Sequence, residues 1–163
     1  MTHFFNLEKN FRAISEGVDF CSLRFIREKT EQLSVRQNVV QPLGNTIDSG
    51  VMLTVLHGGG IGYASTSNLS LTGLEDALEI AKDWARLSAG RAVTDFSAIA
   101  MPHPTAEYQS PVETPWQSTT LSDKLDYLRQ ASEALGISEA IVDWSASLRH
   151  VETESLYLTS GGG

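Results

Sequence analysis

The spacing of hydrophobic positions along the chain predicts three amphipathic helices. In each of them apolar residues recur at steps of three and four, as one face of a helix requires. Gly90 and Gly136 follow the second and third of these segments. Glycine is favoured just past a helix end because it adopts positive φ without strain. We therefore expect helices near 4–16, 72–89 and 120–135.

The faces of the later two helices differ in composition. Thr72 and Glu75 have the spacing of an N-terminal capping box for the second helix. Its inward face should carry Leu74, Ala77, Leu78, Ala81, Ala85 and Ser88, short side chains that let a helix approach a sheet closely. Its acidic residues, Glu75, Asp76, Glu79 and Asp83, indicate a solvated surface. The stripe of the third helix should be Leu121, Leu125, Leu128, Ser132 and Leu135.

Alternating apolar and polar residues predict the strands. One strand is marked by Cys21, Leu23 and Phe25, and another by Leu33, Val35 and Val39. The polar segment 28–31 between them is either a turn or a solvated crossing within a strand. Two more strands are expected at 142–148 and 156–158. The segment 91–118 contains four prolines, which forbid a continuous helix and indicate an irregular loop, either functional or a surface connector.

The most informative stretch is a short apolar segment followed by glycines. Residues 51–56 carry no charge and are too few for an ordinary helix, so they predict a strand buried on both faces. Gly58, Gly59, Gly60 and Gly62 come next, overlapping a second apolar segment at 61–64. Two interpretations remain open. One is a tight hairpin turn with close packing, and the other is a phosphate cradle or substrate-binding turn.

The spacing of these glycines does not fit the common nucleotide motifs. A dinucleotide fingerprint needs Gly-x-Gly-x-x-Gly running directly into a helix. Here Tyr63 stands three residues after Gly60, and the helical pattern resumes only near Thr72. The Gly-Lys-Ser/Thr of a P-loop is also absent from the sequence.

Together these elements predict an α+β fold, with a twisted, mainly antiparallel sheet and about three helices packed on one face. The chain has 163 residues, 41% of them hydrophobic, which suits a single domain over 1–163. The net charge of −8 and scattered basic residues argue against direct nucleic-acid binding. A single cysteine, Cys21, fits a reducing cytoplasm. No run approaches the roughly 18 apolar residues of a membrane helix, so no membrane association is expected.

The sequence carries little recognisable catalytic chemistry. His3, His57, His103 and His150 are far apart, and His-Glu-x-x-His is absent, so we expect neither catalytic residues nor metal ligands here. Ser65 lacks the Gly-x-Ser-x-Gly elbow of a serine nucleophile. His57 is either a polar residue at a hairpin end or faces the cleft of a larger enzyme. The candidates for a substrate cleft or partner contact are His57, Gly59, Gly60, Gly62, Tyr63, Ser65 and Thr66.

Residues 59–69, Gly-Gly-Ile-Gly-Tyr-Ala-Ser-Thr-Ser-Asn-Leu, resemble the "G-G-x-G-[FY]-A-S-T-x-x-L" signature of the TldD/PmbA family. Members of this family are described as metallopeptidases and as modulators of DNA gyrase. The flanks agree, because 17–25 resembles the family's "G-A-D-Y-A-D-[LV]-R" strand and an alanine-rich helix follows at 74–89. The resemblance is close over residues 5–90 and looser beyond them.

The resemblance implies the N-terminal domain of a longer, cytoplasmic, zinc-dependent peptidase that acts on peptides or unfolded proteins. It also implies a homo- or hetero-oligomer with TldD/PmbA-type subunits. The family's zinc motif, His-Glu-x-x-x-His, would lie downstream, and a PmbA-type parent would lack it. This chain would then shape the substrate chamber and subunit contacts and be inactive alone. The alternatives are a stand-alone protein-binding or regulatory module, or a small-ligand binder at the Gly58–Gly62 turn.

Overall fold

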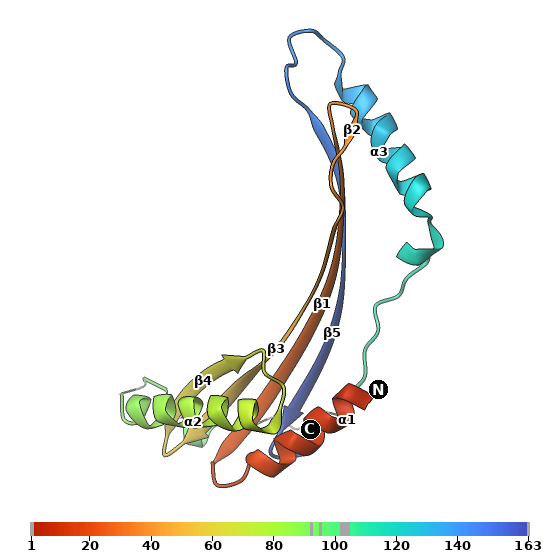
Figure 1. The fold of residues 1–163 in the computed structure, drawn as a ribbon. Coiled ribbons are helices and arrows are strands. Elements are labelled where there is room, and N and C mark those ends of the chain that lie inside the picture. The colour runs from red at the N-terminus through yellow and green to blue at the C-terminus, as the bar shows by residue number, and fades with distance from the viewer. Residues whose placement is uncertain (1, 92, 95, 102–104, 163) are drawn as a thin grey trace. The chain divides into compact units, whose positions relative to one another are not determined.

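The computed structural model describes residues 2–91, 93–94, 96–101 and 105–162, and these residues form three α-helices and a five-stranded antiparallel sheet (Figure 1). The predicted α+β class is confirmed. The sheet order is β2-β1-β3-β4, and β5 also pairs with β1. In chain order the elements are α1 (Thr2–Ile14), β1 (Phe20–Arg36), β2 (Val39–Val40), β3 (Gly44–His57), β4 (Gly60–Thr66), α2 (Leu71–Ser88), α3 (Leu121–Leu135) and β5 (Ser145–Thr159).

The chain divides into two compact units. Unit 1 comprises residues 1–27, 49–107 and 154–163, and unit 2 comprises 28–48 and 108–153. The strands β1, β3 and β5 each contribute residues to both units. Whether the chain behaves as one domain in solution stays a prediction.

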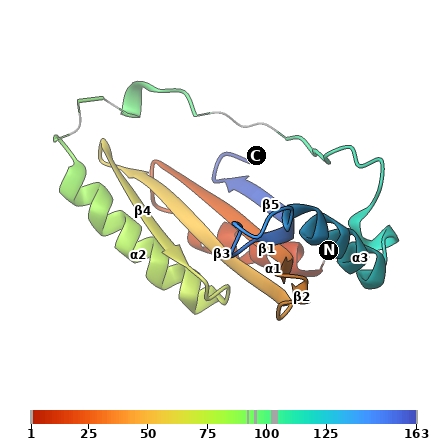
Figure 2. The same ribbon diagram turned by 90° about the horizontal axis from the view of Figure 1, so that it is seen from above.

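Unit 1 is organised around one hydrophobic core. The apolar faces of α1 and α2 pack against β1 and β3, and Phe11, Leu23, Leu53 and Leu74 are completely buried there. Each such burial is worth roughly 1.5–3 kcal/mol relative to exposure. Figure 2 shows α2 lying alongside β4, with which it is in contact. The predicted inward face of α2 is confirmed, because its leucines and alanines are buried.

The prediction that residues 51–56 are buried on both faces is wrong. Val51, Leu53 and Val55 are buried, whereas Met52 is 41% exposed and Thr54 is half-buried. The helices cover one face of this antiparallel sheet, so burial alternates from Val51 to Val55, although Leu56 at the end of the run is buried as well. The sequence hides this alternation because the outward positions Met52 and Thr54 carry no charge.

The polar segment 28–31 is not a turn but the middle of β1, a single strand of 17 residues. The two strands expected at 142–148 and 156–158 are likewise one strand, β5. Exposed strands tolerate polar side chains because their backbones are hydrogen-bonded to neighbouring strands, whatever the side chains are. The polar residues therefore led to predicted breaks in β1 and β5, but pairing with distant strands keeps each of them continuous.

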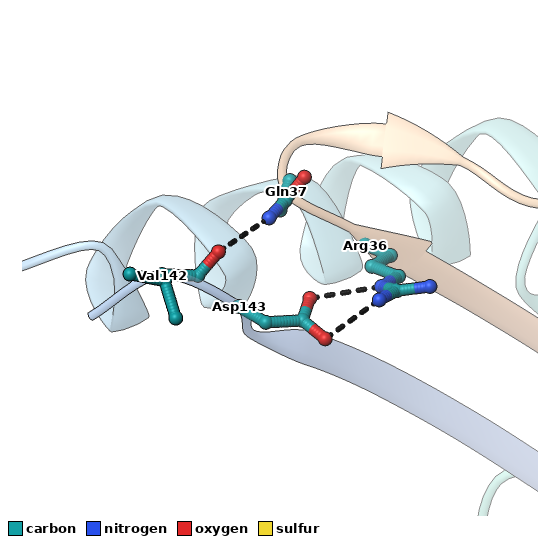
Figure 3. Close-up of polar contacts among 4 residues, drawn as sticks. All are labelled: Arg36, Gln37, Val142 and Asp143. Carbon is teal, nitrogen blue, oxygen red and sulfur yellow. Dashed lines mark hydrogen bonds and ion pairs between the residues drawn. The ribbon is translucent and has the colours of Figure 1, made fainter.

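In unit 2 the chain reverses at Gln37 and Asn38, within what was expected to be a strand. Both residues have positive φ, 48° and 63°, and β2 pairs back on β1 with Val35 opposite Val40. Figure 3 shows how the turn is held by the segment before β5. Arg36 donates two hydrogen bonds to the Asp143 carboxylate, at 2.8 and 2.7 Å, and the Gln37 amide donates to the Val142 carbonyl. The hydrogen bond from Arg36 lowers the pKa of Asp143.

The buried face of α3 differs from the predicted leucine stripe. Leu128 and Ser132 are buried as expected, but Leu121 and Leu135 are exposed, and Lys124 is buried instead. The Lys124 ammonium lies 3.7 Å from the Trp116 ring centroid and 3.3 Å from the Glu31 carboxylate. A cation over an aromatic face and beside a carboxylate is compensated for its lost hydration. The sequence around Lys124 does not indicate its burial, because Trp116 and Glu31 reach it only through the fold.

The expected irregular segment 91–118 is confirmed over its described residues. Its regular structure there is two short 3₁₀ helices, Phe96–Ala98 and Trp116–Ser118. In unit 2 the Trp116 ring stacks on His150 with centroids 4.8 Å apart, which anchors the end of this segment. His103 lies outside the described residues.

The Asn38 position predicts opposite effects for two substitutions. Asn38→Val should destabilise the fold by about 1–2 kcal/mol, because a β-branched residue resists positive φ. Asn38→Gly should be neutral or slightly stabilising, because glycine is preferred at the second position of this kind of hairpin turn. Urea denaturation of the two variants measures the difference. Equal stabilities would contradict the turn geometry.

The buried thiol of Cys21 predicts an alkaline loss of stability. Burial raises its pKa from 9.0 to about 12. Between these values the folded state holds a proton that the unfolded state has released, so stability is present below pH 9 and falls as the pH rises through this window. Between pH 9 and about pH 10.5, the wild type should therefore lose up to ~2 kcal/mol more of its free energy of unfolding than the Cys21→Ala variant does. Urea denaturation at the two pH values measures this difference. Equal losses would contradict a buried thiol.

Candidate functional site

The glycine-rich signature forms a hairpin between β3 and β4. Its turn is Gly58-Gly59, with φ of 59° and 78°, a conformation that favours glycine at both positions. The register places His57 opposite Gly60, Leu53 opposite Ala64 and Val51 opposite Thr66. The hairpin predicted from the sequence is therefore confirmed.

The two glycines on β4 face α2 at very close range. A Cβ placed on Gly60 would lie 1.9 Å from the Ala85 carbonyl oxygen, and one on Gly62 would lie 1.9 Å from that of Ala81. No side chain fits in this space. The glycines let the backbone of β4 lie directly on the alanine face of α2, which supports the hairpin-and-packing interpretation of the signature.

Serine hydroxyls bond at the two ends of α2, and the one at the C-terminal end ties the helix to β4. The Ser88 hydroxyl accepts from the Ile61 amide at 2.8 Å and lies 2.7 Å from the Ile61 carbonyl, to which it donates. At the other end the N-cap is Ser70, whose hydroxyl accepts from the Gly73 amide. The capping box predicted at Thr72 is therefore wrong by two residues. Ser70 caps the helix without forming a capping box, because the third helical position is Gly73 and not glutamate, and this hides the signal.

The two stretches that resemble the family meet at the turn. The Asp19 carboxylate accepts a hydrogen bond from the Gly58 amide at 2.8 Å, and the Asp19 amide donates to the Leu56 carbonyl at 3.1 Å. A phosphate cradle needs turn amides directed at a ligand. At Gly58 that amide is already bonded to a carboxylate of the same unit.

The remaining candidates are divided between the two faces of the hairpin. His57 and Thr66 share the α2 side with Gly60 and Gly62, whereas Tyr63 and Ser65 point to the opposite face, because side chains alternate along a strand. Tyr63 is 52% exposed and Ser65 is exposed. The His57 Nδ1 atom is buried without a hydrogen-bond partner in the described part of the chain. A role of these residues in substrate contact stays a prediction.

The described residues do not fit a catalytic metal centre. Among them there is no group of three or more His, Cys, Asp or Glu side chains placed to hold an ion. Cys21 is buried with a raised pKa, so it resists forming the thiolate that a metal requires. His150 is stacked on Trp116. Within the same described part, no helix is both long and apolar enough to cross a membrane.

Comparison with known proteins agrees with the resemblance seen in the sequence. Residues 21–85 match the family model for PmbA/TldA metallopeptidase domain 1. The predicted resemblance to the N-terminal domain of the TldD/PmbA family is thereby confirmed. No curated protein matches the chain significantly.

Solved structures share this fold. A proposed modulator of DNA gyrase from Thermotoga maritima matches 98% of the chain with a TM-score of 0.71 and 16% identity. A proposed modulator of DNA gyrase from Bacteroides thetaiotaomicron also matches 98% of the chain, with a TM-score of 0.72 and 20% identity. TldE from Thermococcus kodakarensis matches 96% of the chain, with a TM-score of 0.68 and 15% identity. The chain spans 36%, 37% and 35% of the length of these proteins, respectively.

The close contact between β4 and α2 predicts that adding a single methyl group to Gly62 lowers the stability of the fold. Gly62→Ala should destabilise the fold by about 1–3 kcal/mol or more, because the backbone of α2 must shift to admit the side chain. Gly44→Ala is the matched control within a strand, since its Cβ would meet nothing closer than 3.6 Å. Thermal and urea unfolding should show the control unchanged or slightly stabilised. Equal effects would contradict the close packing.

Proposed function

We propose that this chain acts as the N-terminal domain of a TldD/PmbA-like metal-dependent peptidase, shaping the substrate chamber and subunit contacts while the metal is held by other residues. The observation that carries the proposal is the use of the signature glycines as a scaffold, because Gly60 and Gly62 lie against Ala85 and Ala81. The family description and the fold shared with longer proteins support it.

The metal chemistry implied by the family would come from outside the described residues. When bound, zinc in such a peptidase supplies an activated water for attack on a peptide carbonyl. The residues of this chain would contribute by positioning. Asp19 holds the turn through the Gly58 amide, and Ser88 holds β4 through the backbone of Ile61. Cytoplasmic location, peptide substrates and zinc in the parent protein belong to the same proposal.

The alternative of a small-ligand binder at Gly58–Gly62 has less support. Two of its glycines are packed against α2, and the Gly58 amide is bonded to Asp19. A thermal-shift screen with nucleotides and metabolites tests this alternative. A ligand that raised the melting temperature of the wild type would favour it.

Zinc binding and peptidase activity of the chain give the direct test. We expect substoichiometric zinc by elemental analysis after dialysis against the metal, and no cleavage of unfolded casein. One equivalent of tightly bound zinc, lost in His57→Ala and accompanied by cleavage, would overturn the proposal. A His-Glu-x-x-x-His motif in the reading frame beyond Gly163 is the outcome expected for a TldD-type parent.

A further inference from the structure

Helix α2 has a second apolar face that the core of unit 1 does not cover. Ile80, Trp84 and Leu87 are 53%, 57% and 55% exposed, respectively. Their spacing of four and three residues places them on one line along the helix. Single exposed apolar residues are ordinary, but three large ones in a row form a contiguous patch, which marks an interaction surface. We call these three residues the α2 stripe.

The α2 stripe adjoins the edge of the sheet. A hollow of about 420 Å³ lies between its Trp84 and Leu87 and the residues Ile61 and Tyr63 of β4. The strand β4 is at the end of the sheet order, next to β3 alone. Figure 2 shows α2 on the far side of β4 from β3. An apolar helix face, an open hollow and a sheet edge therefore lie together in unit 1.

Charges at the two ends of the α2 stripe indicate which partner fits. Asp76 stands four residues before Ile80, on the same line of the helix, and Arg91 follows Leu87 by four residues and lines the hollow. Both are exposed, and no ion pair to either is found among the described residues. The surface thus has a negative end and a positive end, with Trp84 near its middle.

A second copy of the same surface is complementary to this pattern in one orientation. When two stripes run antiparallel about a twofold axis near Trp84, Asp76 of each copy meets Arg91 of the other. Parallel stripes would place like charges together, which is unfavourable. We propose that the α2 stripe is a homodimerisation surface on which two copies pack antiparallel, each covering the hollow of the other. This proposal rests on the subunit contacts of the proposed function and names their surface.

Sedimentation velocity over a range of protein concentrations tests the contact. The wild-type chain should form a dimer, and Trp84→Glu should raise the dissociation constant at least about tenfold, because a buried aromatic at the centre of an interface contributes most. Tyr127→Glu, at an exposed aromatic on α3, is the control and should dimerise as the wild type does. Circular dichroism confirms that each variant is folded.

Charge reversal tests the identity and the orientation of the partner. Asp76→Arg and Arg91→Asp should each weaken the dimer when alone, because each creates two like-charge contacts across the twofold axis. Mixing the two variants should restore association, since each contact in the mixed dimer joins opposite charges. The double variant should also recover. The antiparallel orientation is indicated by both results together, weakening in each single variant and recovery on mixing. In a parallel pair each single variant would keep the same number of like-charge contacts as the wild type and would not be weakened.

Three results would overturn the proposal. They are a monomer at every concentration, a dimer that Trp84→Glu leaves intact, and charge-reversed variants that do not recover on mixing. The last result, with Trp84 still required, would mean that the two copies meet through the stripe in another orientation. None of these outcomes changes the expected zinc content or peptidase result, so the two proposals fail separately.

Discussion

The contact between the backbone of β4 and the alanine face of α2 is the constraint on which unit 1 depends. Gly60 and Gly62 bring the strand so close that a methyl group on either would collide with a helix carbonyl. Ser88 then fixes the helix along its axis by bonding both backbone groups of Ile61. Since this contact is short, it also determines which side of α2 remains outside.

This contact changes the meaning of the signature. A cluster of glycines suggests a binding turn, but here two of them serve helix packing and the other two make the reversal between strands. Asp19, from the second stretch that resembles the family, holds that reversal through the Gly58 amide. The motif therefore acts as a folding device, which leaves the outer face of α2 and residues beyond the scaffold available for function.

Much of the fold could be predicted from local patterns. The three helices and the glycine hairpin were predicted because periodicity and turn residues act over a few positions. The full length of β1 and β5, the Gln37-Asn38 turn and the burial of Lys124 could not be predicted. Each of these depends on partners elsewhere in the chain. The long strands depend on the strands that pair with them, the turn depends on Asp143 and Val142, and the burial of Lys124 depends on Trp116 and Glu31.

The α+β class, the inward face of α2 and the family resemblance all follow from the order and spacing of residue types along the chain. That Ala85 and Ala81 of α2 occupy the space beside Gly60 and Gly62, and that Trp84 lies outside, follows from the fold alone. A glycine gives the same local signal whether its empty side faces a ligand or a helix. The distinction is made by whatever the rest of the chain places there.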